Sequence, residues 1–351
     1  ARMSGSSRAA LACLAIVAAG GASAPRAAAF VDPLDLPAAP SVRAPRSAVA
    51  AVARAGARLV AVGQRGHVLL SDDGGASWTQ ASVPVSTDLT AVHFPTPSTG
   101  FAVGHDGVVL STADGGLTWT RRLDGRALAP LLRARCGGGG VAAEQACALA
   151  ARAPDAAFLD VWFEDASSGF AVGAFNLVVR TEDGGASWTP WLDRVENPRG
   201  LHLYAVRGAG GAVLLAGEQG LLLRLDPGAR RFRAIPAPRG GTLFGLVATA
   251  DAVVAFGLGG RALRSGDGGA SWREVATGVD ASLTGGTVLP DGRIALASQS
   301  GRVLVSGGGG GSFRPIGSGS PGRVPPAAAI AAAEPDAVVL GGPAGLRRER
   351  L

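Results

Sequence analysis

Short apolar runs recur along the chain at nearly constant spacing, and a glycine-rich turn follows each pair of runs. Residues 59–78, 100–119, 169–188 and 253–272 share one plan: an apolar run that ends in glycine, a two-residue turn, a second apolar run, and then Asp-Gly-Gly-x-Ser/Thr-Trp. Runs of this length bounded by turn residues are typical of β-strands. Because the runs are almost continuously apolar, the strands are expected to be buried on both faces.

The same plan can be traced seven times along the chain. Two decayed copies cover residues 213–232 and 294–313, and a truncated copy covers residues 337–351. Trp78 and Trp119 are 41 residues apart, as are Trp272 and Phe313. A period near 40 residues with several short strands is the pattern of a propeller blade. The sequence therefore predicts an all-β fold, a seven-bladed β-propeller of four-stranded antiparallel blades.

The two ends of the chain are expected to close this ring. Runs such as 89–94 and 159–163 are expected to form inner strands, and the chain ends after a third strand. The last blade then lacks its outer strand, which residues 30–49 are predicted to supply, so that no strand edge is left free. Four prolines in that segment make the predicted strand short.

The Asp-Gly-Gly-x-Ser/Thr-Trp segment belongs to a longer Asp-box motif, Ser/Thr-x-Asp-x-Gly-x-x-Trp. The aspartate and the hydroxyl can accept backbone N–H groups inside a tight turn, and the glycines can adopt positive φ. Identical aspartates on separate blades cannot converge on one substrate, so we predict a structural role rather than catalysis. The predicted structural residues are Asp73, Trp78, Asp114, Trp119, Asp183, Trp188, Asp267 and Trp272.

Composition agrees with a turn-rich β-protein and adds a prediction about its location. The 351 residues include 54 glycines, and 47% are hydrophobic. Residues 1–29 have two early arginines, a short apolar stretch and then small residues, which is the pattern of a secretory signal peptide. The domains are therefore predicted as a signal peptide at 1–29 and a propeller at 30–351, exported to the periplasm or a similar compartment. Cys13 is the alternative, as the site of a lipid anchor.

The formal net charge of +6 does not by itself indicate nucleic-acid binding. The arginines are spread along the chain, and no nucleic-acid motif accompanies them. Cys136 and Cys147 could form a disulfide in an oxidising compartment, although two free thiols are the alternative. With four histidines in the chain and none near these cysteines, we expect no metal and no cofactor. A monomer is expected.

Residues 125–154 interrupt the period between blades two and three. Within them, residues 145–152 are rich in alanine, which indicates a helix. The insert is expected to leave the ring on the same face as the turn at residues 104–107. A long loop on a regular scaffold often carries function. A tolerated insertion is the alternative.

The repeats resemble BNR/Asp-box repeats, and the Phe-Ala-Val-Gly run before the box resembles the Ycf48/HCF136 family of photosystem II assembly factors. The resemblance covers residues 49–351. It implies a non-enzymatic propeller that holds a client protein during assembly, in the lumen or periplasm, through an arginine-rich patch. The arginines at the end of the third strand are the candidates for that patch, with solvated surface arginines as the alternative: Arg180, Arg224, Arg264 and Arg347, or Arg348 near the same place. The equivalent residues of blades one, two and six are Leu70, Ser111 and Val305.

Two other functions are considered because propellers with these boxes also serve them. A sialidase-like glycoside hydrolase needs a tyrosine nucleophile, a carboxylate and an arginine cluster, and the candidates are Tyr204, Glu196 and the segment 233–236. A carbohydrate-binding propeller would need exposed aromatic side chains. Most tryptophans belong to the boxes; Trp162 is predicted to be core and Trp191 to be exposed.

Overall fold

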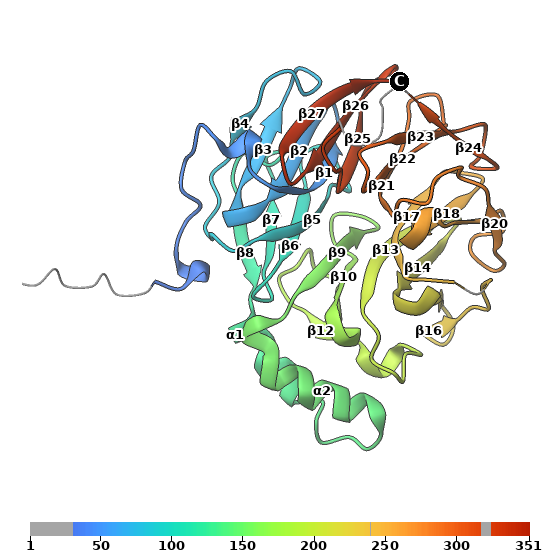
Figure 1. Cartoon of the computed structure of the whole chain (residues 1–351). Helices are drawn as coiled ribbons and strands as arrows, with labels where there is room; N and C mark the ends of the chain where they lie inside the picture. Colours follow the sequence, from blue (N-terminus) through green and yellow to red (C-terminus); the bar gives the residue numbers. More distant parts are fainter. Residues whose placement is uncertain (1–30, 239, 317–323) are drawn as a thin grey trace, which may run out of the picture. The chain divides into compact units, whose positions relative to one another are not determined.

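A computed structural model describes residues 31–238, 240–316 and 324–351, and within it residues 32–351 form one unit. Seven antiparallel sheets surround a common centre (Figure 1). The fold predicted from the repeat period is confirmed, with six sheets of four strands and one of three. The strands of the first three blades are β1 (Val49–Ala55), β2 (Arg58–Gly63), β3 (Val68–Ser71), β4 (Thr79–Gln80); β5 (Leu89–His93), β6 (Gly100–Gly104), β7 (Val109–Thr112), β8 (Thr120–Leu123); and β9 (Phe158–Phe163), β10 (Gly169–Gly173), β11 (Val178–Thr181), β12 (Thr189–Pro190).

The remaining blades repeat this order from the inner to the outer strand. They consist of β13 (Leu203–Ala209), β14 (Ala212–Gly217), β15 (Leu222–Asp226), β16 (Arg231–Ala234); β17 (Leu243–Ala248), β18 (Val253–Gly257), β19 (Ala262–Ser265), β20 (Arg273–Val275); β21 (Leu283–Val288), β22 (Ile294–Ser298), β23 (Val303–Ser306), β24 (Phe313–Ile316); and β25 (Ala329–Glu334), β26 (Ala337–Gly342), β27 (Gly345–Arg350). Short 3-10 turns connect strands at η3 (Gln64–Gly66), η5 (Ala174–Asn176), η6 (Leu192–Arg194), η7 (Glu218–Gly220) and η8 (Leu258–Gly260), and η4 (Ala153–Asp155) precedes β9.

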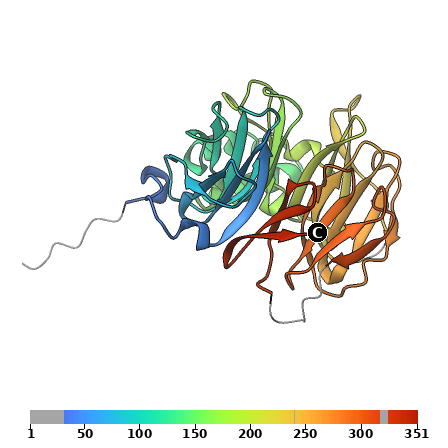
Figure 2. The same ribbon diagram turned by 90° about the horizontal axis from the view of Figure 1, so that it is seen from above.

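The ring is closed by packing between blades. Each inner strand contacts the inner strand of the next blade, and β25 of the last blade contacts β1 of the first. Figures 1 and 2 both show the red last blade beside the blue first blade. Val339 and Leu346 of the last blade pack into clusters with residues of the first blade. Burial on both faces explains why the strands read as nearly continuous apolar runs.

The predicted closing strand is wrong. Residues 32–48 form the 3-10 turns η1 (Pro33–Asp35) and η2 (Ala44–Arg46) and no strand, while residue 30 lies outside the described residues. The last sheet keeps three strands, in the order β25-β26-β27. The four prolines of this segment lack the N–H that a ladder needs, and they hold φ near the value of a turn. The segment therefore packs against β27 through η2 without pairing to it.

Each Asp box forms a closed set of hydrogen bonds within its own turn. In blade three, Thr181 donates its hydroxyl to Asp183 (2.8 Å) and accepts the N–H of Gly185 (2.9 Å), while the N–H of Ser187 donates to Asp183 (2.9 Å). The hydroxyl and backbone N–H of Ser187, followed by Thr181, lower the pKa of Asp183 to about 2. The boxes at Asp73, Asp114 and Asp267 repeat the same bonds.

Two helices form the insert between blades two and three (Figure 1). The helix predicted over residues 145–152 is α2 (Val141–Arg152), and a second helix, α1 (Gly125–Arg133), was not predicted. Asp124 caps α1 by accepting the N–H of Ala127. Gly125 donates its N–H to Asp106, so the insert leaves the ring beside the turn of blade two, on the expected face. No helix among the described residues is long and apolar enough to cross a membrane.

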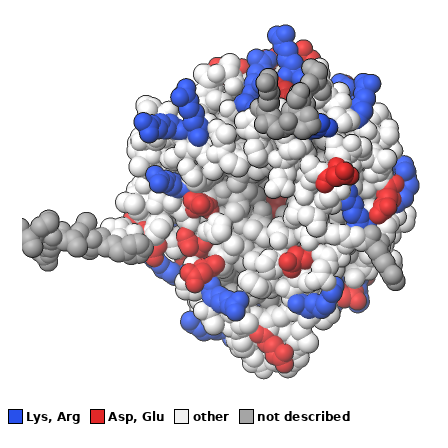
Figure 3. Space-filling model, in the orientation of Figure 1, with Lys and Arg blue, Asp and Glu red and all other residues white. Residues whose placement is uncertain are grey.

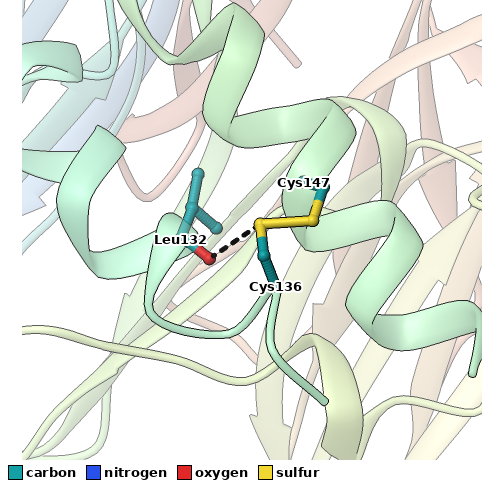
Figure 4. Close-up of a disulfide and its surroundings, with 3 residues drawn as sticks. All are labelled: Leu132, Cys136 and Cys147. Carbon is teal, nitrogen blue, oxygen red and sulfur yellow. Dashed lines mark hydrogen bonds between the residues drawn. A yellow bond between two sulfur atoms is a disulfide. The ribbon is translucent and has the colours of Figure 1, made fainter. Parts of the chain in front are cut away.

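A disulfide joins the start of the α1–α2 connection to the middle of α2. Figure 4 shows Cys136, just after α1, bonded to Cys147 on α2. Four glycines, residues 137–140, lie between Cys136 and the first turn of α2. The bond therefore restrains a loop whose own backbone has little conformational preference.

Candidate arginine site

Three of the four predicted arginines occupy the same place in consecutive blades. Arg180 on β11 pairs with Phe170, Arg224 on β15 pairs with Leu214, and Arg264 on β19 pairs with Val254. In each blade the paired residue packs against the next blade. Side chains of directly paired residues point to the same side of a sheet. The three arginines therefore point toward the next blade.

Arg347 does not occupy the equivalent position in the last blade. Arg347 pairs with Leu340, which packs against blade six, and its Nη2 donates to the carbonyl of Gly301 in blade six. The neighbouring Arg348 pairs with Val339, which packs against blade one. Because side chains alternate along a strand, a difference of one residue places them on opposite faces. Arg348 is therefore the counterpart of Arg180, and the prediction of Arg347 is corrected.

Two of the three arginines hold the next blade in place. Arg224 donates its Nε to the carbonyl of Gly268 (3.1 Å), and Arg264 donates its Nε to the carbonyl of Gly309 (2.6 Å). Gly268 belongs to the Asp box of blade five, and Gly309 belongs to the decayed box of blade six. These arginines thus stabilise contacts between blades, and the structure does not gather the four predicted arginines into one cluster.

A different set of arginines does converge, on the ring of Trp191. The guanidinium carbons of Arg180, Arg194 and Arg230 lie 4.8, 5.1 and 5.9 Å from the centre of the indole. Glu182 accepts from Arg180 (2.9 Å) and from Arg230 (3.3 Å). We call Arg180, Arg194 and Arg230 the arginine site. It lies where blade three meets blade four, because Arg194 follows the outer strand of blade three and Arg230 lies in the box loop of blade four.

The electrostatics of the arginine site favour an added negative charge. Burial lowers the pKa of Arg180, Glu182 opposes this shift, and the like charges of Arg230 and Arg194 lower the pKa further. A guanidinium group carries a positive charge and presents only hydrogen-bond donors. Within the described residues, Arg180 and Arg230 share the carboxylate of Glu182, and Arg194 forms no ion pair. A cation over an indole gains about 0.5–2 kcal/mol.

Sequence reasoning missed Arg194 and Arg230 and misplaced Trp191. The indole was expected to be exposed, but only 4% of Trp191 is accessible, because it packs against Phe170 and Phe232 under the three arginines. One signal in the sequence could have indicated the site. In the decayed box of blade four, Arg230 takes the place of a small residue of the regular box. Trp191 directly follows β12, the outer strand of blade three.

The candidates for hydrolytic chemistry lie apart from one another. Tyr204 lines a cavity of about 140 Å³ at the ring centre, formed by residues of all seven inner strands. Burial, followed by the charge of Glu218, raises the pKa of the Tyr204 hydroxyl. Glu196 instead accepts the N–H of Ala234, beside the segment 233–236. Within the described residues Tyr204 and Glu196 share no hydrogen bond, and no group of three or more metal-ligating side chains is found.

An ion pair is buried at the central cavity between blades three and four. Asp160 on β9 accepts from Arg207 on β13 (2.6 Å) and from the N–H of Val206 (2.9 Å). Burial raises the pKa of Asp160, against the effect of Arg207. His93 on β5 accepts the N–H of Phe163 at Nδ1 (3.2 Å), and burial followed by the charge of Arg207 lowers its pKa to about 3.

Charge on the face seen in Figure 1 is mixed. Figure 3 shows acidic and basic side chains interspersed over the face seen in Figure 1. A surface of both signs gives little long-range steering of a charged partner. Recognition by charge on such a surface depends on local clusters such as the arginine site.

Comparison with known proteins supports the resemblance suggested by the repeats. The family model described as Photosynthesis system II assembly factor YCF48 matches residues 70–129 and 145–239. A curated relative from Synechococcus sp. (strain CC9902), named Photosystem II assembly lipoprotein Ycf48, is 30% identical over 123 residues, which is 34% of this chain. This protein is Ycf48-like. The alignment spans 37% of the length of that curated relative.

Solved structures agree with the fold of the Ycf48-like chain. A structure of YCF48 bound to D1 peptide is 17% identical with a TM-score of 0.62, and covers 87% of this chain and 94% of the other. YCF48 from Cyanidioschyzon merolae is 16% identical with a TM-score of 0.61, covering 87% and 96%. The WD40 propeller domain of Doa1 is 12% identical with a TM-score of 0.59, covering 90% and 95%. At these identities the likeness establishes the propeller fold.

The two ranges that match the Ycf48 model include the arginine site and leave out part of the insert. All three residues of the arginine site lie inside the matched range 145–239, whereas residues 130–144 lie outside both matched ranges. That gap holds the end of α1, Cys136 and the first turn of α2. The arginine site thus lies within a segment that matches the family model.

Proposed function

We propose that this Ycf48-like protein is a non-enzymatic scaffold that holds a client protein, and that the arginine site binds carboxylates of the client. The observation that carries the proposal is the convergence of three guanidinium groups on one buried indole with a single directly bonded carboxylate. Arginine pairs with carboxylates through two parallel hydrogen bonds, so a cluster of this kind suits acidic side chains or a chain terminus.

The client is proposed by analogy with the related proteins. One YCF48 structure has a D1 peptide bound, and the family model is described as a photosystem II assembly factor. We therefore propose a membrane-associated or exported client, with D1 as the first protein to test. Arg224 and Arg264 would act mainly through their inter-blade contacts, and Arg348 through its ion pair with Glu334 of its own blade.

Export supports the same function, because an assembly scaffold has to meet its client. The proposed signal peptide at 1–29 and the alternative lipid anchor at Cys13 both lie outside the described residues. The relative from Synechococcus is named as a lipoprotein. We propose that the mature protein acts in the periplasm or thylakoid lumen, where the disulfide between Cys136 and Cys147 would persist.

Binding of the D1 peptide by purified protein tests the arginine site. Wild type should bind the peptide with an affinity that falls as salt is added, because the contact is ionic. The variant Arg194→Gln/Arg230→Gln removes two charges of the arginine site and should bind at least tenfold more weakly. Arg273→Gln/Arg314→Gln removes two exposed arginines of other blades and should bind like wild type.

The outcome decides between the proposals. Equal affinity for wild type and Arg194→Gln/Arg230→Gln would remove the arginine site from the function. Turnover of a fluorogenic sialoside by the pure protein, lost in Tyr204→Phe, would replace the scaffold by a glycoside hydrolase. Capture from native membranes that recovers the same proteins with wild type and with the double variant would also count against the arginine site.

A further inference from the structure

A groove lies between α2 and the turns of the neighbouring blades, apart from the arginine site. Its volume is about 380 Å³. One wall is a face of α2, and the other is the blade-three turn with the loop that leads into blade four. We call it the α2 groove; its lining residues include Val141, Glu144, Ala148, Arg152, Phe175 and Arg199.

The turn of blade three differs from the equivalent turns in the residue that contacts α2. The corresponding turns of blades one, two, four and five end in glycine with positive φ, whereas blade three has Asn176 with a φ of 64°. The Asn176 amide donates to Gln145 of α2 (2.8 Å), and Asn197 donates to Asn176 (3.1 Å). Gln145 also donates to the carbonyl of Asn197 (3.0 Å). This buried network fixes α2 against the ring, so the groove exists before anything binds.

Phe175 has a strained backbone and an exposed side chain. Its φ is 56°, a left-handed conformation that is costly for a bulky side chain, and 46% of the residue is exposed. The equivalent turns have Arg65, Asp106, Gln219 and a glycine at this place. The guanidinium of Arg152 lies 5.2 Å from the ring centre of Phe175. An exposed aromatic ring on a strained backbone is typical of a binding surface.

The charges of the α2 groove are separated along its length. Glu144 and Arg152 lie eight residues apart on the same side of α2, which is about 12 Å along the helix. Arg199 donates to Gln219 (2.6 Å). None of the ion pairs among the described residues involves Glu144, Arg152 or Arg199. On the helical wall of the groove, Glu144 therefore lies toward the N-terminal end of α2 and Arg152 toward its C-terminal end, with Ala148 between them. Phe175 and Arg199 belong to the opposite wall.

We infer that the α2 groove binds an extended peptide segment of a protein partner, with an apolar side chain between a basic and an acidic one. An extended chain advances about 3.3 Å per residue, so about four residues span the distance between Glu144 and Arg152. The apolar side chain packs on Phe175 and Ala148, the base meets Glu144, and the carboxylate meets Arg152. The inference does not rest on the arginine site.

Two blocked peptides of opposite order test the groove, because the direction of the bound chain is open: Gly-Lys-Ala-Phe-Ala-Glu-Gly and Gly-Glu-Ala-Phe-Ala-Lys-Gly. Their binding is followed by amide chemical shifts of the isotope-labelled full protein. One order should saturably shift the resonances of residues 141–152 and bind at least fivefold more tightly than the other. The variant Glu144→Arg/Arg152→Glu should reverse that preference, an outcome that loss of fold cannot mimic.

Phe175→Gly removes the ring and relieves the backbone, so the protein should stay folded and bind at least tenfold more weakly. Arg65→Gly is the matched control, because Arg65 has the same φ of 56° in blade one and is exposed. Arg194→Gln/Arg230→Gln should bind these peptides like wild type. Absence of saturable shifts for both orders, or equal binding by wild type and Phe175→Gly, overturns the inference and leaves the arginine site untouched.

Discussion

Acidification should destabilise the propeller through one histidine at its centre. His93 accepts the N–H of Phe163 at Nδ1, and its ring lies 6.4 Å from that of Trp162. Protonation of Nδ1 would turn this acceptor into a donor and would place a second positive charge near Arg207. Burial and the charge of Arg207 accordingly lower the pKa of His93 to about 3. The folded protein therefore keeps His93 neutral at pH values at which the unfolded chain protonates it.

The size and direction of the effect follow from this pKa. A histidine with a depressed folded pKa stabilises the fold fully above its unfolded value of about 6.5, and that stability is lost as the pH falls toward 3. Each pH unit costs about 1.4 kcal/mol where only the unfolded state binds the proton, so we expect a loss of about 2 kcal/mol between pH 6.5 and 4.5. Asp160 acts in the opposite direction, because its raised pKa favours the protonated fold as the pH falls.

Urea unfolding at several pH values between 7 and 4.5 measures this loss. In His93→Gln the amide oxygen can still accept the N–H of Phe163 but cannot gain a charge, so the variant should lose about 2 kcal/mol less than wild type over the same interval. His105→Gln, on the exposed turn of the same blade, should behave like wild type. The box aspartates do not contribute, because their lowered pKa values place their loss of stability below about pH 4. Identical pH profiles for wild type and His93→Gln would refute the reasoning.

Two further predictions concern the ring and the insert. Trp119→Ala should lower the free energy of unfolding by about 3–5 kcal/mol, because the indole is buried and donates to the carbonyl of Gly116 (2.9 Å). Trp78 is only partly buried, so Trp78→Ala should lower it clearly less. Equal losses in urea unfolding would contradict the difference in burial. Replacing Cys136 and Cys147 together by serine should cost about 2–3 kcal/mol, and reductant should lower the melting temperature of wild type but not of the double variant.

The ring itself could be predicted from the sequence because its determinants are local. A glycine-bounded apolar run forms a strand wherever it occurs, and the box hydroxyl and aspartate bond only to their own turn. Seven such units with one period leave few alternatives to a propeller. The strands β5 and β9 accordingly lie where apolar runs were predicted to form inner strands. The closing strand failed for a local reason too, since prolines prevent pairing.

The arginine site could not be predicted because its residues meet only through packing between blades. Arg180, Arg194 and Arg230 come from a strand, a 3-10 turn and a loop, and only the buried position of Trp191 brings them together. The exchange of Arg347 for Arg348 has a similar origin. Both arginines fit the pattern of residues, but the strand register decides which one points to the next blade.

Three departures from the repeat lie at the border of blades three and four, in addition to the decayed box of blade six and the three-stranded last blade. Asn176 replaces a turn glycine, Arg230 occupies a decayed box, and Asp160 lies at a position where the inner strand of blade two has Ala91. Each departure costs stability that the regular repeat would keep. Asn176 needs Gln145 to satisfy its buried amide, and Asp160 needs Arg207. Random decay would scatter unpaired losses around the ring. At this border the departures come with specific partners, and the same sector contains the arginine site and the α2 groove, so we expect client recognition to concentrate there.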